Sequence, residues 1–367
     1  MDLGNIVKGF TFEGEFSGAE KYTFGHINDT YIVYFTNKGK KEKRRYILQK
    51  INQNVFNNPE QVMENIEKVI RHLQDKIIEN GGDLKRETLN IVPSVDGKCF
   101  YRCSRDDFWR AYEYIEGSRS YQIVESPYHF YSAGRTVGKF QKLLHDFPPS
   151  ALYETIPGFH DTRKRYEAFL EAVNKDVLNR AQNVREEIDF VKHREDKVSL
   201  LVNMLREGKL PLRVIHNDTK FNNVLIDDQT GEGVCLVDLD TVMPGLSLYD
   251  FGDAIRYGTN LAGEDEHDLS KVNMDAMLYE QFCRGYLETT GDILAEDEVK
   301  LLPFAAWLIT LECGMRFLTD YLNGDVYFKV SREGQNCQRA RTQFKLVWDM
   351  ESKYELMKNI VEKYRKN

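Results

Sequence analysis

The sequence predicts an α+β protein of two lobes, an antiparallel sheet in the N-terminal lobe and mainly helices in the C-terminal lobe. Alternating apolar residues with short polar breaks dominate the first third of the chain, which is typical of paired strands. Apolar residues at helical spacing dominate the remainder. A chain of 367 residues is also too long for a single hydrophobic core. We therefore expect a cleft between the lobes.

The N-terminal lobe is expected to span residues 1–113 and to contain a sheet of about five strands. One helix interrupts these strands, since Asn58 and Pro59 are typical of a helix start and apolar residues recur at helical spacing as far as Gly81. The predicted strands cover residues 22–24, 30–35, 45–51, 89–92, 98–102 and 108–115.

The C-terminal lobe is expected to span residues 114–367, because helical patterns follow the segment from Glu113 to Gly117. The predicted helices cover residues 127–146, 162–175, 186–207, 271–289, 296–322 and 340–364. Short β-like runs at 212–215, 224–226 and 234–237 lie among them, and unusual polar residues follow these runs.

The overall charge excludes some classes of partner. A net charge of −8 argues against a general nucleic-acid or anionic-membrane binder, so a phosphate ligand would need local cations. We see no signal-peptide layout and expect no membrane span. The six cysteines are scattered, which favours reduced, structural thiols. We expect a cytoplasmic monomer or homodimer.

The segment from His216 to Asn223 carries the most distinctive polar residues. It ends one apolar run and begins the next, so its side chains occupy a loop held by two strands. Asp238 and Asp240 follow the next β-like run, and Asp250 and Asp253 lie farther on in a predicted helix. A lone His-x-Asp or Asp-x-Asp is usually a turn or capping device. The joint spacing instead indicates a site.

Phosphoryl transfer from ATP needs a carboxylate to orient the hydroxyl and oxygen ligands for Mg²⁺ on the phosphates. In this interpretation Asp218 is the base, and Asn223 and Asp238 bind Mg²⁺, with Asp240 as a further metal carboxylate. His216 would brace the loop by hydrogen bonds. General-base help contributes about 10²- to 10⁴-fold, so electrostatics and positioning must supply the rest.

Two resemblances sharpen this hypothesis. His216-x-Asp218-x4-Asn223 with Val237-Asp238 and Asp250 resembles the signature of the aminoglycoside phosphotransferase and choline kinase superfamily, whose fold is protein kinase-like. Longer segments resemble the N-acetylhexosamine 1-kinases, and the likeness spans nearly the whole chain. These segments are Gly25–Tyr31, Tyr46–Gln49, His216–Lys220, Asp238–Thr241 and Glu312–Phe317.

The resemblance implies a reaction in which the anomeric hydroxyl of N-acetylglucosamine or N-acetylgalactosamine attacks the γ-phosphate of ATP bound with Mg²⁺. The products would be the sugar 1-phosphate and ADP. Relatives acting on homoserine, choline, methylthioribose or an aminoglycoside remain alternatives. A pseudokinase that binds nucleotide and senses a sugar without turnover is another.

On the nucleotide side, the resemblance assigns the phosphates to the turn that contains Gly25, Asn28 and Thr30. Glycine and short polar residues allow close backbone approach in such a turn. Glu113 and Ile115 resemble the hinge that reads adenine with backbone groups.

The third strand departs from the superfamily pattern, in which a Lys or Arg holds the α and β phosphates. The corresponding residue here is Gln49, and its neighbour Lys50 should point to the opposite face. Either Gln49 contacts phosphate as a neutral donor, or a bulge turns Lys50 inward. In the second case Glu67, on the following helix, would be its partner.

On the acceptor side, the resemblance places His26 near the sugar, together with Arg316, Asp320 and Tyr327. Arginine can donate several hydrogen bonds to sugar oxygens, and tyrosine offers a ring face and a hydroxyl. An exposed helix with Arg316 and Asp320 as an ion pair is the structural alternative. Lys220 would face the transferred phosphoryl group or solvent.

Two other motifs carry less weight. Residues 134–140 suggest a P-loop, but the spacing is one residue short, Phe140 replaces Ser or Thr, and the segment looks helical. Asp238-Leu239-Asp240 could be a glycosyltransferase metal motif. That interpretation leaves the spacing from His216 to Asn223 unexplained.

Overall fold

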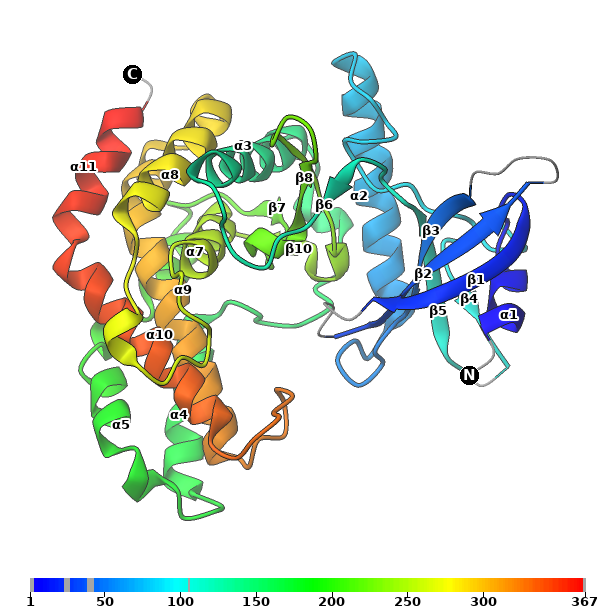
Figure 1. Cartoon of the computed structure of the whole chain (residues 1–367). Helices are drawn as coiled ribbons and strands as arrows, with labels where there is room; N and C mark the ends of the chain where they lie inside the picture. The colour runs from blue at the N-terminus through cyan, green and yellow to red at the C-terminus, as the bar shows by residue number, and fades with distance from the viewer. Residues whose placement is uncertain (1–2, 23–26, 38–42, 105, 366–367) are drawn as a thin grey trace.

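The computed structural model describes residues 3–22, 27–37, 43–104 and 106–365. Figure 1 shows a small β-sheet part beside a larger helical part, with one long helix, α2 (Pro59–Glu79), between them. The predicted α+β class, an antiparallel sheet in the N-terminal lobe and helices in the C-terminal lobe, is confirmed.

The main sheet is antiparallel, with strand order β1-β2-β3-β5-β4. Its strands are β1 (Glu15–Tyr22), β2 (Asp29–Thr36), β3 (Lys43–Lys50), β4 (Tyr101–Arg102) and β5 (Phe108–Glu113). The strand expected at residues 89–92 is wrong, since this segment contributes only an isolated bridge from Ile91 to Tyr112. The side chain of Asn90 donates back to the Leu84 carbonyl, which holds the segment in a turn.

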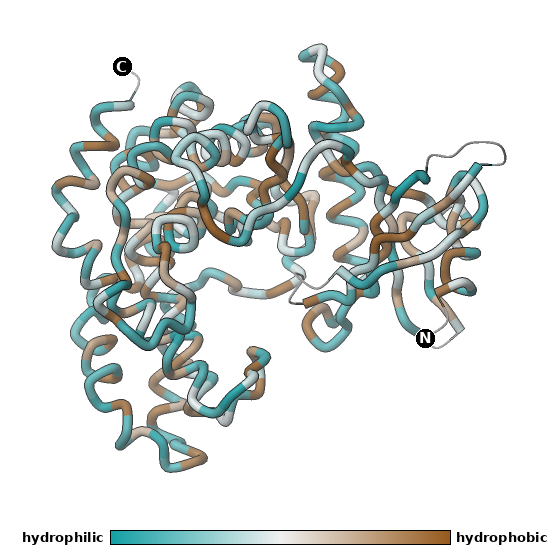
Figure 2. The backbone as a smooth tube through the Cα atoms, in the orientation of Figure 1, coloured by the Kyte–Doolittle hydropathy of each residue, from teal (hydrophilic) through white to brown (hydrophobic). Residues whose placement is uncertain are grey.

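The two faces of this sheet pack differently. One face buries Val33, Leu48 and Trp109 against the N-terminal segment, which includes α1 (Leu3–Ile6). The other face looks toward α2 and the cleft. Figure 2 shows hydrophobic residues alternating with hydrophilic ones along these strands. Because side chains alternate along a strand, neighbouring residues of β3 and β5 serve different faces.

The helix α2 joins the sheet to the helical lobe. Asn58 caps its N-terminus by accepting a hydrogen bond from the Gln61 N–H, and Pro59 occupies its first turn. Its buried Asn65 donates to the carbonyls of Tyr153 and Val242 in the helical lobe. The two lobes are thus linked through buried polar contacts of α2.

The helical lobe follows most of the predicted pattern. Two long predicted helices are each divided in two: residues 186–207 form α5 and α6, and residues 340–364 belong to α10 and α11. Arg194 ends α5 by donating to the Phe190 carbonyl and pairing with Glu351. The helices are α3 (Pro127–Leu143), α4 (Thr162–Lys175), α5 (Arg185–Lys192), α6 (Leu200–Arg206), α7 (Ser247–Gly258), α8 (Ala276–Thr290), α9 (Glu296–Leu322), α10 (Gln335–Ser352) and α11 (Tyr354–Tyr364).

Within the described part of the chain, α9 alone has the length and apolar composition of a membrane-crossing helix. Its most apolar window has a mean hydropathy of 1.4, but 83% of that window is buried inside the protein. Burial on this scale is typical of a core helix.

Short strands carry the loops between the helices. They are β6 (Ser118–Arg119), β7 (Arg213–Ile215), β8 (Val224–Asp227), β9 (Gly233–Leu236) and β10 (Met243–Gly245). β5 ends at Glu113, and β6 then pairs with β8 in the helical lobe. We accordingly propose the boundary between the lobes at residues 113 and 114.

Glycines allow α3 and α8 to cross closely. A Cβ atom on Gly134 would lie 2.5 Å from the Phe282 carbonyl oxygen, and one on Gly285 would lie 2.1 Å from that of Tyr131. The glycines that suggested a P-loop therefore lie within α3, where Gly134 serves helix packing.

We expect Gly285→Ala to lower the free energy of unfolding by about 1–3 kcal/mol, because the added methyl group must push the helices apart. Urea titration measures this change. Gly263→Ala is the matched control, since its nearest neighbour lies 3.9 Å away, and it should change stability by less than about 0.5 kcal/mol. Equal effects of the two substitutions would contradict close packing at this crossing.

Candidate active site in the cleft

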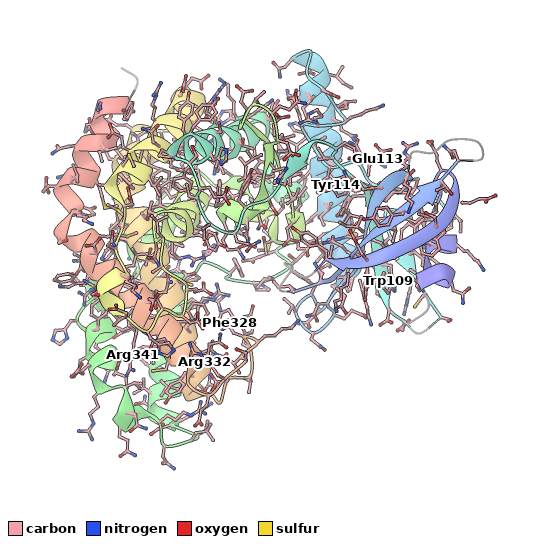
Figure 3. The ribbon with its side chains drawn as sticks, viewed as in Figure 1. Trp109, Glu113, Tyr114, Phe328, Arg332 and Arg341 are labelled. Atoms are coloured by element: carbon pink, nitrogen blue, oxygen red, sulfur yellow. The ribbon has the colours of Figure 1, made fainter. Side chains whose placement is uncertain are left out.

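A cavity of about 390 Å³ lies between the lobes. Ile32 and Ile47 line it from the sheet, and Leu225 and Val237 line it from the helical lobe, which gives it an apolar slot. Figure 3 labels Glu113 and Tyr114, both of which line this cavity, where β5 leaves the sheet toward the helical lobe. The polar lining includes Thr30, Gln49, Asp218, Lys220, Asn223 and Asp238.

The loop between β7 and β8 presents the first polar residues. His216 is fully buried, and its Nδ1 accepts a hydrogen bond from the Asp218 N–H at 3.2 Å. Its Nε2 must then carry the proton and donate to the Val237 carbonyl at 3.0 Å. His216 thus ties its own loop to the segment that carries Asp238.

Asp250 anchors the same loop by hydrogen bonds to its backbone. This fully buried carboxylate of α7 accepts the backbone N–H groups of His216 at 3.0 Å and Asn217 at 2.7 Å. It also accepts a hydrogen bond from Gln141 at 3.0 Å. Burial raises the pKa of Asp250. Asn217 takes a left-handed conformation with φ of 67°, which these bonds help to stabilise.

Asp218 presents a carboxylate to the cavity. Lys220 Nζ lies 3.1 Å from its Oδ1, and Asn223 Nδ2 donates to its Oδ2 at 3.0 Å. Desolvation in the cleft raises the pKa of Asp218, but the charge and hydrogen bond of Lys220, together with the hydrogen bond from Asn223, outweigh this effect and hold the pKa below its ordinary value. Asp218 is therefore ionised at neutral pH. Conversely, Asp218 and Asp253 raise the pKa of Lys220 despite its burial.

Asp238 and Asn223 offer the oxygen ligands that Mg²⁺ prefers. The Asp238 side chain is 37% exposed, and no described residue donates a hydrogen bond to it. Asn223 donates through its Nδ2 to Asp218, and no described residue donates a hydrogen bond to its amide oxygen. Desolvation and the carboxylates of Asp240 and Asp218 raise the pKa of Asp238 to about 7. A carboxylate in such surroundings fits a divalent cation.

Asp240 does not offer a free metal ligand. Its Oδ1 accepts a hydrogen bond from Arg110, and its Oδ2 accepts one from Asn28 at 2.5 Å. The side chain is 5% exposed. We correct its predicted role: Asp240 joins the sheet lobe to the helical lobe.

Lys50 and Glu67 lie away from the cavity, which corrects the alternative that a bulge brings them together. β2 and β3 pair in continuous register through Lys50, without a bulge. Lys50 points to the far face and pairs with Asp107 at 2.8 Å, while Glu67 pairs with Arg71 at 2.6 Å. Gln49 is the residue of β3 that lines the cavity at this position.

The remaining nucleotide-side predictions fall partly within the described chain. Thr30 lines the cavity and accepts a hydrogen bond from Gln49 Nε2 at 3.0 Å. Glu113 and Ile115 line it as well, and no hydrogen bond among the described residues uses the Ile115 N–H. Gly25 and His26 lie outside the described residues.

On the predicted acceptor side, Arg316 lies on α9 beside aromatic rings. Its guanidinium carbon lies 5.1, 6.0 and 5.6 Å from the ring centroids of Phe159, Tyr327 and Phe328, respectively. Figure 3 labels Phe328 on the loop between α9 and α10. Within the described ranges, Arg316 has neither a hydrogen bond nor an ion pair, so its N–H donors remain available.

Asp320 shapes this loop. Its carboxylate accepts the backbone N–H groups of Val326, Tyr327 and Phe328 at 3.0, 2.8 and 2.9 Å. Asn336 donates to it as well, and Asp320 is only 4% exposed. The predicted substrate contact is therefore corrected to a loop-forming role, and no ion pair with Arg316 is found in the described chain.

Buried polar contacts connect the acceptor side to the Asp218 loop. Glu312, one turn before Arg316, accepts hydrogen bonds from His160 Nδ1 at 2.7 Å and Thr162 at 2.6 Å. The other ring nitrogen of His160 lies 3.4 Å from the Asn217 carbonyl oxygen.

Sequence reasoning did not assign a role to Arg110, His160 or Glu312. Arg110 lies in an apolar strand pattern, and only the pairing of β3 with β5 places it opposite Gln49. A charged residue inside a predicted strand was the one available signal.

Comparisons with known proteins agree with this fold. A profile of the phosphotransferase enzyme family matches residues 19–299. An aminoglycoside phosphotransferase from Alicyclobacillus acidocaldarius subsp. acidocaldarius DSM 446 has a similar structure, with a TM-score of 0.62, 14% identity and coverage of 96% of this chain and 95% of that chain. A choline kinase from Cryptosporidium parvum Iowa II has a TM-score of 0.58, 16% identity and coverage of 100% and 99%. A spectinomycin phosphotransferase in complex with ADP and spectinomycin has a TM-score of 0.59, 12% identity and coverage of 95% and 97%. At these identities the structures show a shared fold.

We expect Asp250→Asn to lower the free energy of unfolding by about 1–3 kcal/mol, because the new amide leaves a buried N–H donor at 216 or 217 without an acceptor. Chemical denaturation measures the loss. Asp75→Asn, on the exposed face of α2, is the control and should stay within about 0.5 kcal/mol of the parent protein. Unchanged stability in Asp250→Asn would contradict the anchoring role.

Proposed function

Because the chain belongs to the phosphotransferase enzyme family, we propose that it is an ATP-dependent kinase acting on the 1-hydroxyl of N-acetylglucosamine or N-acetylgalactosamine. One observation carries the proposal. The Asp218 carboxyl group, held by Lys220 and Asn223, faces the same cavity as Asp238. A hydroxyl-orienting carboxylate beside oxygen ligands for Mg²⁺ is the arrangement that phosphoryl transfer requires.

The nucleotide fits the apolar slot in this proposal. Ile32 and Ile47 on one side, with Leu225 and Val237 on the other, suit a flat purine ring. The Ile115 N–H supplies a backbone donor at the edge of the slot. The ADP complex of the similar spectinomycin phosphotransferase supports a nucleotide in this fold.

Asn223 and Asp238 would hold Mg²⁺. The ion supplies charge neutralisation on the phosphate oxygens when it is bound. Asp218 accepts or orients the proton of the attacking hydroxyl, and its lowered pKa keeps it ionised for that task. Lys220 fixes the carboxylate through Oδ1 and places a positive charge beside the transferred group.

The acceptor assignment rests on the resemblance of the motifs from His216, Asp238 and Glu312 to the N-acetylhexosamine 1-kinases, together with the surroundings of Arg316. Aromatic rings, and N–H donors that no described residue engages, suit the apolar and hydroxyl faces of a sugar.

Charge on the acceptor side favours a neutral acceptor. Arg165 donates to the Phe159 carbonyl, and burial lowers its pKa, with a further contribution from the charge of Arg316. A cationic acceptor such as choline or an aminoglycoside would be repelled there.

We expect Asp218→Asn to reduce kcat by about 10²- to 10⁴-fold, because an amide cannot accept the hydroxyl proton. Steady-state ADP release measures kcat, and calorimetry with Mg²⁺ and ADP checks that nucleotide affinity is retained. Asp196→Asn, an exposed substitution in the helical lobe, should retain the parent rate. Near-normal turnover by Asp218→Asn would contradict the assignment of Asp218 as the base. A parent protein without activity would favour the pseudokinase alternative.

A panel of acceptors tests the substrate class. We expect ATP consumption with N-acetylglucosamine or N-acetylgalactosamine and much slower consumption with glucosamine, choline and an aminoglycoside, because the positive charge of Arg165 and Arg316 disfavours cations. Homoserine and methylthioribose should also react slowly, because neither is an N-acetylhexosamine. Phosphorus NMR should place the new phosphate on the anomeric carbon. A product that still reduces Cu²⁺ has a free anomeric carbon and contradicts a 1-kinase.

A further inference from the structure

The cavity lacks a cation on the third strand. Kinase-like folds use a lysine there to hold nucleotide phosphates, but Gln49 occupies the cavity face of β3 and Lys50 turns away. The residue paired with Gln49 on the neighbouring strand is Arg110 of β5. Its guanidinium group lies on the same face of the sheet, directly behind the cavity wall.

Arg110 directs each of its nitrogens to a different neighbour. Nε donates to Gln49 Oε1 at 2.9 Å, and Nη1 donates to Asp240 Oδ1. Nη2 lies 3.9 Å from Asp238 Oδ1, an ion-pair distance beyond hydrogen-bond range. The Tyr112 ring centroid lies 5.5 Å from the guanidinium carbon. With 1% of its side chain exposed, Arg110 reaches the cavity only through these neighbours.

The neighbours of Arg110 are themselves connected. Gln49 Nε2 donates to Thr30, and Asp240 accepts from Asn28 near the start of β2. Asn28 in turn accepts the Asn52 N–H at 3.0 Å after the end of β3. One guanidinium therefore fixes three strands of the sheet against the turn that follows Asp238.

We propose that Arg110 is a positioning residue that replaces the third-strand lysine, holding Gln49 and Asp238 in place for a magnesium-bound nucleotide and supplying the missing positive charge from behind the cavity wall. Thr30, Gln49 and Asp238 all line the cavity. A buried pair of Arg110 and Asp240 alone would not require contacts with the other two. This inference rests on the nucleotide part of the proposed function.

The first experiment separates charge from folding. Arg110→Met leaves Asp240 buried and unpaired, so this variant alone is expected to lose thermal stability. Arg110→Met combined with Asp240→Asn removes both charges and should recover much of the melting temperature. We expect the double variant still to bind Mg²⁺ and ADP about tenfold more weakly than the parent in calorimetry, because Gln49 loses its hydrogen bond to Arg110 and the cavity loses the nearby positive charge.

The second experiment separates the nucleotide from the acceptor. Arg110→Lys keeps a positive charge but cannot reach Gln49, Asp240 and Asp238 together. We expect its KM for ATP to rise severalfold while its KM for the sugar stays within about twofold, a split that general loss of structure does not produce. Lys50→Met is the matched control, since Lys50 pairs with Asp107 on the opposite face, and its Mg²⁺ and ADP affinity should match that of the parent.

The outcomes are distinct. If the parent does not bind Mg²⁺ and ADP, the proposed nucleotide function fails together with this inference. If the parent binds and both the folded double variant and Arg110→Lys bind equally well, Arg110 is only the structural partner of Asp240 and the inference is overturned. If the double variant does not fold, the nucleotide affinity and the KM for ATP of Arg110→Lys test the inference without it. Weaker nucleotide binding by Lys50→Met than by Arg110→Lys would assign the missing cation to Lys50 instead.

Discussion

A single buried carboxylate, that of Asp250, anchors the loop that carries Asp218 into the cleft. Its bonds to the backbone of His216 and Asn217 fix the path of the loop that carries Asp218. His216 is in turn hydrogen-bonded to the carbonyl of Val237, next to Asp238. This bond ties the two segments together. A carboxylate without water to solvate it is stable only with its hydrogen bonds complete. The loop and the helix below it are therefore constrained together.

Local patterns in the sequence were sufficient for much of this architecture. Helix α4 matches its predicted range, and α9 begins and ends where its apolar pattern does, because helical periodicity is a local property. The spacing from His216 to Asn223 located a loop between two strands for the same reason. The clustering of Asp218, Asn223 and Asp238 around one cavity follows from this short stretch of chain.

Contacts between distant segments could not be predicted in this way. Asp240 looked like a metal ligand because its sequence neighbour is Asp238, yet Arg110 and Asn28 occupy its oxygens. Asp320 looked like a sugar ligand, but the backbone it accepts from lies in the following loop. Residues 89–92 had the composition of a strand, and the hydrogen bonds of Asn90 favoured a turn. Each outcome depended on which partner the fold supplied.

In the loop after α9, hydrogen bonds to Asp320 hold the main chain, while the side chain of Tyr327 is exposed. Asp320 accepts hydrogen bonds from the loop's main-chain N–H groups, and Phe328 packs against Phe317 with ring centroids 4.6 Å apart. Tyr327 is 56% exposed. Residues on such a scaffold can be exchanged while the backbone keeps its course. A substitution at Tyr327 would therefore change the side chain beside Arg316 while the hydrogen bonds to Asp320 keep the main chain in place.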